Sequence, residues 1–121
     1  MNAKDRNAQG SGARAEALAS AYLIRRGLTP VARNYRTRHG EIDLIMREKA
    51  VIVFVEVRLR THRTFGGAAA SITPAKRDRL VAAASAYLAT LAREPDCRFD
   101  AMLFDGLDPA RITWERNVLE T

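Results

Sequence analysis

Two acidic residues lie inside segments that are otherwise apolar, and their types and spacing are those of a chemical site. Asp43 lies in the segment EIDLI and Glu56 in the segment VIVFVEVR. Burial of an ionised carboxylate in such a strand costs several kcal/mol of free energy unless a basic partner or a bound cation compensates for its lost hydration. Arg58 follows Glu56 by two residues and therefore lies on the same face of the same strand. Strand, acid, strand and acid-x-base is the layout of a metal-dependent phosphodiesterase site.

Phosphodiester hydrolysis explains why these residue types would be needed. The reaction requires a cation that neutralises charge on the phosphorus oxygens and lowers the pKa of an attacking water. Mg²⁺ or Mn²⁺ suits hard oxygen ligands, and because Mg²⁺ keeps several of its waters, two or three carboxylates are enough. Asp43 and Glu56 could reach a common ion if their strands pair with both acids on one face. The alternation of side chains shows which residues of one strand share a face, but it does not show whether Asp43 and Glu56 lie on the same face of the sheet.

A purely structural interpretation of the same acids also fits the sequence. Asp43 and Glu56 could form ion pairs with Arg36, Arg58 or Arg60. Such pairs would compensate the two carboxylates and would leave no role for a metal. The sequence leaves both interpretations open.

The elements that would position these acids follow from periodicity and turn residues. Apolar residues at helical spacing predict a first helix that ends at Gly27, and Thr73-Pro74 predicts the start of a second helix. The stripe of the first helix is Ala15, Leu18, Ala19, Tyr22 and Leu23. Strands are expected at residues 31–35, 41–47, 51–60, 97–104 and 111–117.

The order of elements is therefore α-β-β-β-α-β-β, which predicts an α/β fold. The first three strands are joined by short links and should be antiparallel. Residues 51–55 are apolar at every position, so helices should cover both faces of the sheet there. Residues 1–12 are expected to form a disordered basic tail, residues 13–121 a single domain, and residues 61–72 a mobile loop.

Composition narrows the class of protein. The 121 residues include 20 Lys and Arg against 14 Asp and Glu, a net charge of +6 that suits a polyanionic partner but is also typical of a solvated basic surface. The single cysteine, Cys97, excludes an intramolecular disulfide and favours a cytoplasmic location. No apolar run is long enough to span a membrane, and no membrane partner is expected.

Several short motifs occur together in an order that resembles a known family. They are Arg33-Asn34-Tyr35-Arg36, Gly40-Glu41-Ile42-Asp43-Leu44-Ile45, Phe54-Val55-Glu56-Val57-Arg58, Phe65-Gly66 and Arg98-Phe99-Asp100. This combination resembles the YraN-like family of small uncharacterised bacterial proteins, and the match covers most of the chain. That family is placed in the restriction-endonuclease-like fold with the PD-(D/E)XK nuclease site, and it is similar to archaeal Holliday-junction resolvases.

The resemblance implies a mixed central sheet flanked by helices on both faces and a set of site residues. Asp43 and Glu56 would be metal ligands, and Glu16 on the first helix matches an acid that some relatives add to the site. Arg58 stands where the superfamily has its lysine. Arginine stays protonated and cannot act as a base, so Arg58 would contact the phosphate or support Glu56.

The leading hypothesis is a Mg²⁺- or Mn²⁺-dependent nuclease, or a descendant of one, that acts on structured or single-stranded DNA. Its catalytic residues would be Asp43, Glu56, Arg58 and Glu16. The residues expected to bind the nucleic-acid backbone are Arg36, Arg38, Arg60, Arg63 and Lys76. The alternatives are a catalytically silent module of the same fold that binds nucleic acid or a DNA-processing protein, and a structural adaptor that contacts no nucleic acid.

Overall fold

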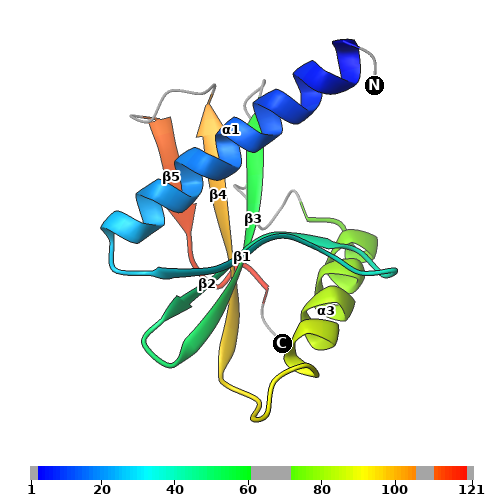
Figure 1. Ribbon diagram of the computed structural model, residues 1–121, viewed down its shortest axis with the longest axis vertical. Helices are drawn as coiled ribbons and strands as arrows, with labels where there is room; N and C mark the ends of the chain where they lie inside the picture. Colours follow the sequence, from blue (N-terminus) through cyan, green and yellow to red (C-terminus); the bar gives the residue numbers. More distant parts are fainter. Residues whose placement is uncertain (1–2, 61–71, 106–110, 120–121) are drawn as a thin grey trace.

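The computed structural model describes residues 3–60, 72–105 and 111–119, and in these ranges a five-stranded sheet is packed between two helices (Figure 1). The elements in chain order are α1 (Ala3–Arg25), β1 (Thr29–Arg36), β2 (Glu41–Glu48), β3 (Val51–Arg60), α3 (Pro74–Leu88), β4 (Cys97–Asp105) and β5 (Ile112–Glu115). The order α-β-β-β-α-β-β and the α/β class expected from the sequence are confirmed.

The sheet is mixed, and β3 occupies its centre. The strand order is β1-β2-β3-β4-β5, with antiparallel pairing everywhere except between β3 and β4, which are parallel. The parallel pair needs a crossover connection, and α3 lies within it. Its central place explains why β3 begins with an unbroken apolar run, since a central strand covered on both faces has no solvent-facing positions.

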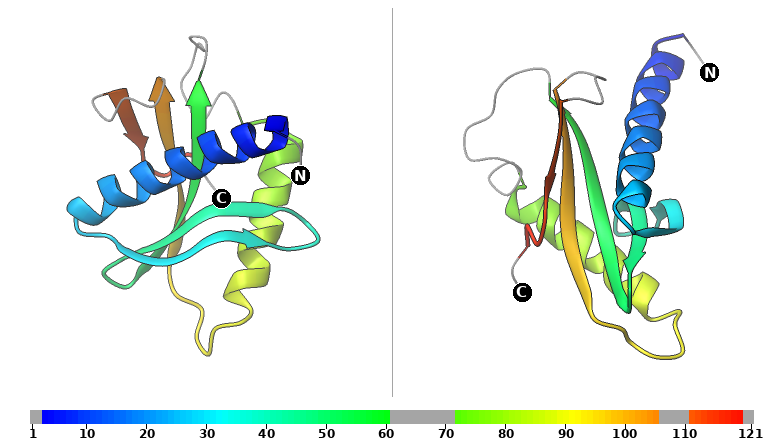
Figure 2. Two further views of the ribbon diagram at one scale, coloured as in Figure 1. Left: turned by 45° about the horizontal axis from the view of Figure 1, so that its top comes forward. Right: turned by 90° about the vertical axis from the view of Figure 1, so that its left-hand side faces the viewer.

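The two helices cover opposite faces of this sheet (Figures 1 and 2). Ala19 and Leu23 of α1 pack into one apolar cluster, and Leu80 and Ala84 of α3 pack into the other. Alternate residues of the inner strands divide between the clusters. Those facing α1 include Leu44, Met46, Val53 and Val55, whereas those facing α3 include Ile45, Ile52 and Phe54.

The turn between β1 and β2 is held close to α3. Thr37 Oγ1 accepts hydrogen bonds from the backbone N–H groups of His39 and Gly40 at 3.0 and 3.2 Å. A Cβ atom at Gly40 would lie 3.0 Å from the Arg79 carbonyl oxygen, so only glycine allows this approach without a shift of the helix. The contact fixes the position of the turn before β2, the strand that carries Asp43, relative to α3.

The start of α3 agrees with its sequence signature. Thr73 caps the helix, because its side chain accepts a hydrogen bond of 3.2 Å from the Lys76 N–H, and Pro74 follows at the first helical position. No acidic residue lies in the first turn. The helix therefore presents Lys76 toward the sheet with no compensating acid of its own first turn.

A buried acid in β4 shows how the fold compensates a carboxylate. Asp100 in β4 is 1% exposed and accepts hydrogen bonds from Arg98 Nε, Trp114 Nε1 and the Asn117 N–H at 3.1, 3.0 and 2.9 Å. Arg98 also donates to Glu48 at 2.8 Å. The network ties the end of β2 and the segment after β5 to β4, so its role is structural.

The expected strand limits agree with the structure within about two residues, and β3 has the predicted bounds. One difference concerns the N-terminus, where the helical backbone already begins at Ala3, so residues 3–12 continue α1 instead of preceding it as a tail. The division of the chain into a tail and a domain stays a prediction. Nearly all of the loop expected at residues 61–72 lies outside the described residues.

Replacement of Asp100 by alanine should lower the free energy of unfolding by roughly 2–4 kcal/mol, because it leaves the Arg98 charge and two other donors without their acceptor. Urea denaturation monitored by circular dichroism measures the change. Asp96→Ala, an exposed site before β4, is the matched control and should shift stability by less than about 0.5 kcal/mol. Equal stability of the two variants would contradict the structural role of Asp100.

Candidate functional site

Asp43 lies where β2 and β3 stop pairing. The described register between the two strands runs from Glu48 and Val51 to Leu44 and Val55. Beyond that last pair, the backbone N–H of Val57 donates to Asp43 Oδ2 at 2.8 Å. A side-chain acceptor therefore takes the next donor of β3, and this bond holds the Asp43 carboxylate beside the residue that follows Glu56.

The electrostatic surroundings of Asp43 are unfavourable to its charge. Burial and, next in size, repulsion from Glu56 raise the pKa of Asp43 from 3.8 to about 7, with smaller contributions from Glu16 and Glu41. The Val57 N–H acts in the opposite direction. Within the described ranges Asp43 forms no ion pair, so the arginine partner that the structural interpretation required is not found there.

Glu56 has the basic partners that Asp43 lacks. Its Oε1 atom lies 2.6 Å from Lys76 Nζ and 3.7 Å from Arg58 Nη1. The Glu56 side chain is 12% exposed, against 27% for Lys76 and 31% for Arg58. The structural interpretation thus holds in part for Glu56, although the nearer partner comes from α3 and was not among the arginines considered.

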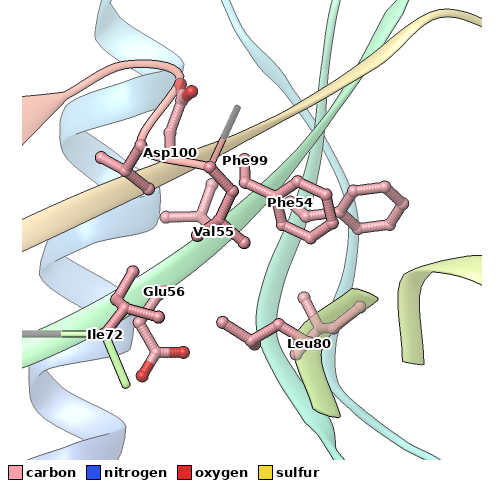
Figure 3. Close-up of a pocket in the computed structure, with 10 residues that line it drawn as sticks. Phe54, Val55, Glu56, Ile72, Leu80, Phe99 and Asp100 are labelled. Carbon is pink, nitrogen blue, oxygen red and sulfur yellow. The ribbon is translucent and has the colours of Figure 1, made fainter. Parts of the chain in front are cut away.

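The apolar surroundings of Glu56 explain its low exposure. A pocket of about 10 Å³, room for about one water, is lined by Glu56 together with apolar side chains that include Ile72, Leu80 and Phe99. Figure 3 shows the Glu56 carboxylate beside Ile72, whereas the carboxylate of Asp100 points away from it. This pocket is too small for a nucleotide.

An open cleft of about 380 Å³ lies on the Asp43 side of the site. Three acids line it, Asp43 and Glu41 from β2 and Glu16 from α1, together with Arg36 and Asn34 of β1. Glu16 thus lines the same cleft as Asp43, and its expected part in a metal site stays a prediction. Arg36 forms an ion pair of 3.5 Å with Glu41 at the exposed rim.

Three carboxylates near Asp43 are the candidate ligands for the expected divalent cation. Asp43, Glu56 and Glu16 offer hard carboxylate oxygens, and the like charges around Asp43 are the kind of crowding that a cation relieves. No three Asp, Glu, His or Cys side chains in the described part of the chain lie close enough to enclose an ion. One or two carboxylates plus waters are sufficient for Mg²⁺, so Asp43 and Glu56 would hold it and Glu16 would lie at its margin.

The residues expected to bind a nucleic-acid backbone lie in different surroundings, and their role stays a prediction. Arg36 and Arg38 are exposed near the turn between β1 and β2, and Arg36 lines the acidic cleft. Lys76 is partly buried and contacts Glu56. The side chain of Arg60 and all of Arg63 lie outside the described residues.

Two site features were not foreseen from the sequence. Glu41 contributes to the charge around Asp43, although its position two residues before Asp43 on the same strand could have indicated it. The pairing of Lys76 with Glu56 joins residues that are twenty positions apart, and no local pattern reports such a contact.

Comparison with known proteins now identifies the group to which this sequence is related. Residues 15–104 match the uncharacterised protein family UPF0102. This range contains Asp43 and Glu56, the strands β1 to β3 and nearly all of β4. The chain belongs to this family. The resemblance to the YraN-like group is thereby confirmed.

Individual UPF0102 relatives support the assignment. A UPF0102 protein of Cupriavidus taiwanensis is 57% identical over 113 residues, covering 93% of this chain and 84% of the relative. A UPF0102 protein of Methylobacillus flagellatus is 57% identical over 100 residues, covering 83% of this chain and 88% of the relative. One from Nitrosomonas europaea is 50% identical over 114 residues, 94% of this chain and 97% of its own.

None of the described helices is both long enough and apolar enough to cross a bilayer.

The raised pKa of Asp43 predicts a pH-dependent effect of Asp43→Asn on stability. The folded-state pKa is about 7 and the unfolded value 3.8, so the wild type loses stability as pH rises from about 4 to 7. Asparagine keeps an acceptor for Val57 and removes the charge. At pH 8 the variant should be more stable than wild type by roughly 1–3 kcal/mol, below the full value of the shift because the side chain is partly exposed.

Urea denaturation at several pH values between 4.5 and 8 measures this difference, which should shrink toward acid pH. Asp96→Asn, which changes the same charge at an exposed site, should show no such trend. A variant less stable than wild type at pH 8 would mean that a compensating cation charge for Asp43 is already present in the protein.

Proposed function

We propose that this protein is a nuclease that uses a divalent cation to hydrolyse phosphodiester bonds in DNA, with structured or single-stranded DNA as the substrate. The observation that carries the proposal is the position of Asp43. Its carboxylate is held by the Val57 N–H next to Glu56, repelled by Glu56 and Glu16, and left without a basic partner in the described residues. A carboxylate placed for stability alone would be compensated, as Asp100 is.

Each residue has a role in this proposal. Asp43 and Glu56 hold Mg²⁺ or Mn²⁺, and Glu16 adds negative charge from α1. The cation, when bound, supplies charge neutralisation at the phosphate and a water of lowered pKa. Arg58 stays protonated and therefore contacts the scissile phosphate or supports Glu56, and it does not remove a proton.

The surface around the cleft supports a long polyanionic substrate. Arg36 lines the cleft, and its exposed side chain (77%) can leave Glu41 for a phosphate at little cost. Arg38 is exposed in the turn that follows β1. Arg60, the last residue of β3, and Arg63 are assigned to backbone binding from the sequence alone. The net charge of +6 is consistent with this partner.

One observation favours a second candidate, a nuclease-fold module without catalytic activity that binds nucleic acid or a DNA-processing protein. Glu56 is already neutralised by Lys76 and Arg58, and arginine occupies the position where related nucleases have lysine. If these ion pairs persist in the presence of metal, the remaining acids cannot complete a catalytic site. The protein would then bind the backbone through its basic residues alone.

The nuclease proposal predicts that Asp43→Ala and Glu56→Ala each abolish cleavage while DNA affinity stays within about threefold of wild type, because the phosphate contacts come mainly from basic side chains. A gel assay on branched, flapped and single-stranded DNA with Mg²⁺ or Mn²⁺ measures cleavage, and fluorescence anisotropy measures binding. Glu94→Ala, at an exposed position after α3, is the control and should cleave like wild type. Cleavage retained in both site variants would reject the proposal.

The two candidates give different results in wild type itself. A silent module should bind DNA with a salt dependence of about 0.9 log unit per phosphate contact for each log unit of salt on duplex DNA, and should not cleave with any divalent metal. A nuclease should cleave at least one of the three substrate types. Turnover lost on addition of a chelator and restored by Mg²⁺ would exclude the silent module.

A further inference from the structure

The contact between Lys76 and Glu56 has a property that an ordinary ion pair at a protein surface lacks. Lys76 Nζ lies 2.6 Å from Glu56 Oε1, and both side chains are largely buried, with exposures of 27% and 12%. The pair joins the first turn of α3 to the centre of β3. The Lys76 ammonium therefore occupies a carboxylate that, in the proposed function, binds a metal ion.

Interactions within α3 do not stabilise the Lys76 ammonium at its position. The first turn of a helix carries the positive end of the macrodipole, which disfavours a cation, and the first turn of α3 contains no acidic residue to offset this. Thr73 satisfies the Lys76 backbone N–H and not its ammonium group. Glu56 is the acid that holds the Lys76 ammonium in the structure.

The charge distribution around Glu56 sets up a competition. Its Oε1 atom already faces Lys76 and, farther away, Arg58. Glu56 is also the acid that repels the Asp43 charge most strongly. A divalent cation between Asp43 and Glu56 would be repelled by an ammonium group on the same carboxylate. Arg58 lies farther from this oxygen, at 3.7 Å, so the Lys76 ammonium at 2.6 Å is the main competitor. Lysine is a compact charge on a flexible four-carbon stem and can move away.

We propose that Lys76 and a divalent cation bind the Glu56 carboxylate alternately, and that arrival of the cation releases the Lys76 ammonium to bind a phosphate of the nucleic acid. This inference rests on the proposed metal site and adds a coupling between metal binding and nucleic-acid binding. Without metal, Lys76 neutralises Glu56 and is withheld from substrate. With metal, the same positive charge becomes available next to the scissile bond, so metal and nucleic acid each strengthen binding of the other.

The test compares wild type with Lys76→Met, which keeps an unbranched side chain, one atom shorter, and removes its charge. Calorimetric titration of Mn²⁺ into the free proteins should show at least about threefold tighter binding in Lys76→Met, because a competing cation is gone. Anisotropy with a single-stranded oligonucleotide, with and without Ca²⁺ as a hard-oxygen-seeking cation, should show that the cation strengthens DNA binding in wild type clearly more than in Lys76→Met.

Two further variants separate this device from general effects of charge and folding. Lys49→Met removes the same charge at an exposed turn at the other end of β2 and should behave like wild type in both measurements. Lys76→Arg keeps a positive charge at the site and should not gain Mn²⁺ affinity. Circular dichroism of each variant shows that the fold is retained, and a merely structural ion pair would change stability without increasing the affinity for Mn²⁺.

The outcomes also separate failure of this inference from failure of the proposed function. Mn²⁺ affinity in Lys76→Met that equals or falls below that of wild type overturns the alternation, even if Asp43→Asn abolishes binding and so supports the metal site. Equal cation dependence of DNA binding in the two proteins overturns the release of Lys76. Absence of Mn²⁺ binding in both folded proteins, or binding unaffected by Asp43→Asn, overturns the metal site and with it the inference.

Discussion

The hydrogen bond from the Val57 N–H to Asp43 Oδ2 is the interaction on which the candidate site depends. It replaces strand pairing with a side-chain contact at the point where the described register of β2 and β3 ends. Because Val57 directly follows Glu56, the bond also brings together the two acids of neighbouring strands. The consequence is electrostatic: burial and repulsion from Glu56 raise the pKa of Asp43 to about 7.

Comparison with Asp100 shows that this arrangement is not a general property of acids in this sheet. Asp100 is more deeply buried than Asp43, yet it accepts hydrogen bonds from an arginine, a tryptophan and a backbone N–H. The fold is therefore capable of compensating a carboxylate inside an apolar sheet. At Asp43 it instead gathers further acids, from β3, from α1 and from β2 itself. Uncompensated charge of this kind is more often found at functional sites than at structural ones.

Much of the fold and part of the site could be predicted from the sequence because the signals are local. Alternation and length indicated β3, and Thr73-Pro74 indicated the start of α3, since each depends on residues within a few positions of one another. The same alternation could have indicated that Glu41 shares the face of Asp43. The face relationship between Asp43 and Glu56 could not be derived, because it depends on the register between two strands and on where that register ends.

Contacts between distant segments explain the remaining differences. The sequence suggested Lys76 as a residue exposed to the nucleic-acid backbone, whereas packing of α3 against β2 and β3 brings its ammonium to Glu56. Glu16 could be associated with the site only through the family resemblance, since nothing in its own helix distinguishes it from an acid placed near a helix start. Its place in the cleft with Asp43 follows from the way α1 crosses the sheet (Figure 2).

The most direct test of the central claim is the position of manganese in crystals of the protein grown or soaked with Mn²⁺, located by its anomalous scattering. The account predicts an anomalous peak in contact with the carboxylates of both Asp43 and Glu56, with the Lys76 ammonium no longer bound to Glu56. Manganese found only elsewhere, or a site at Asp43 alone with Glu56 still paired to Lys76, would contradict it.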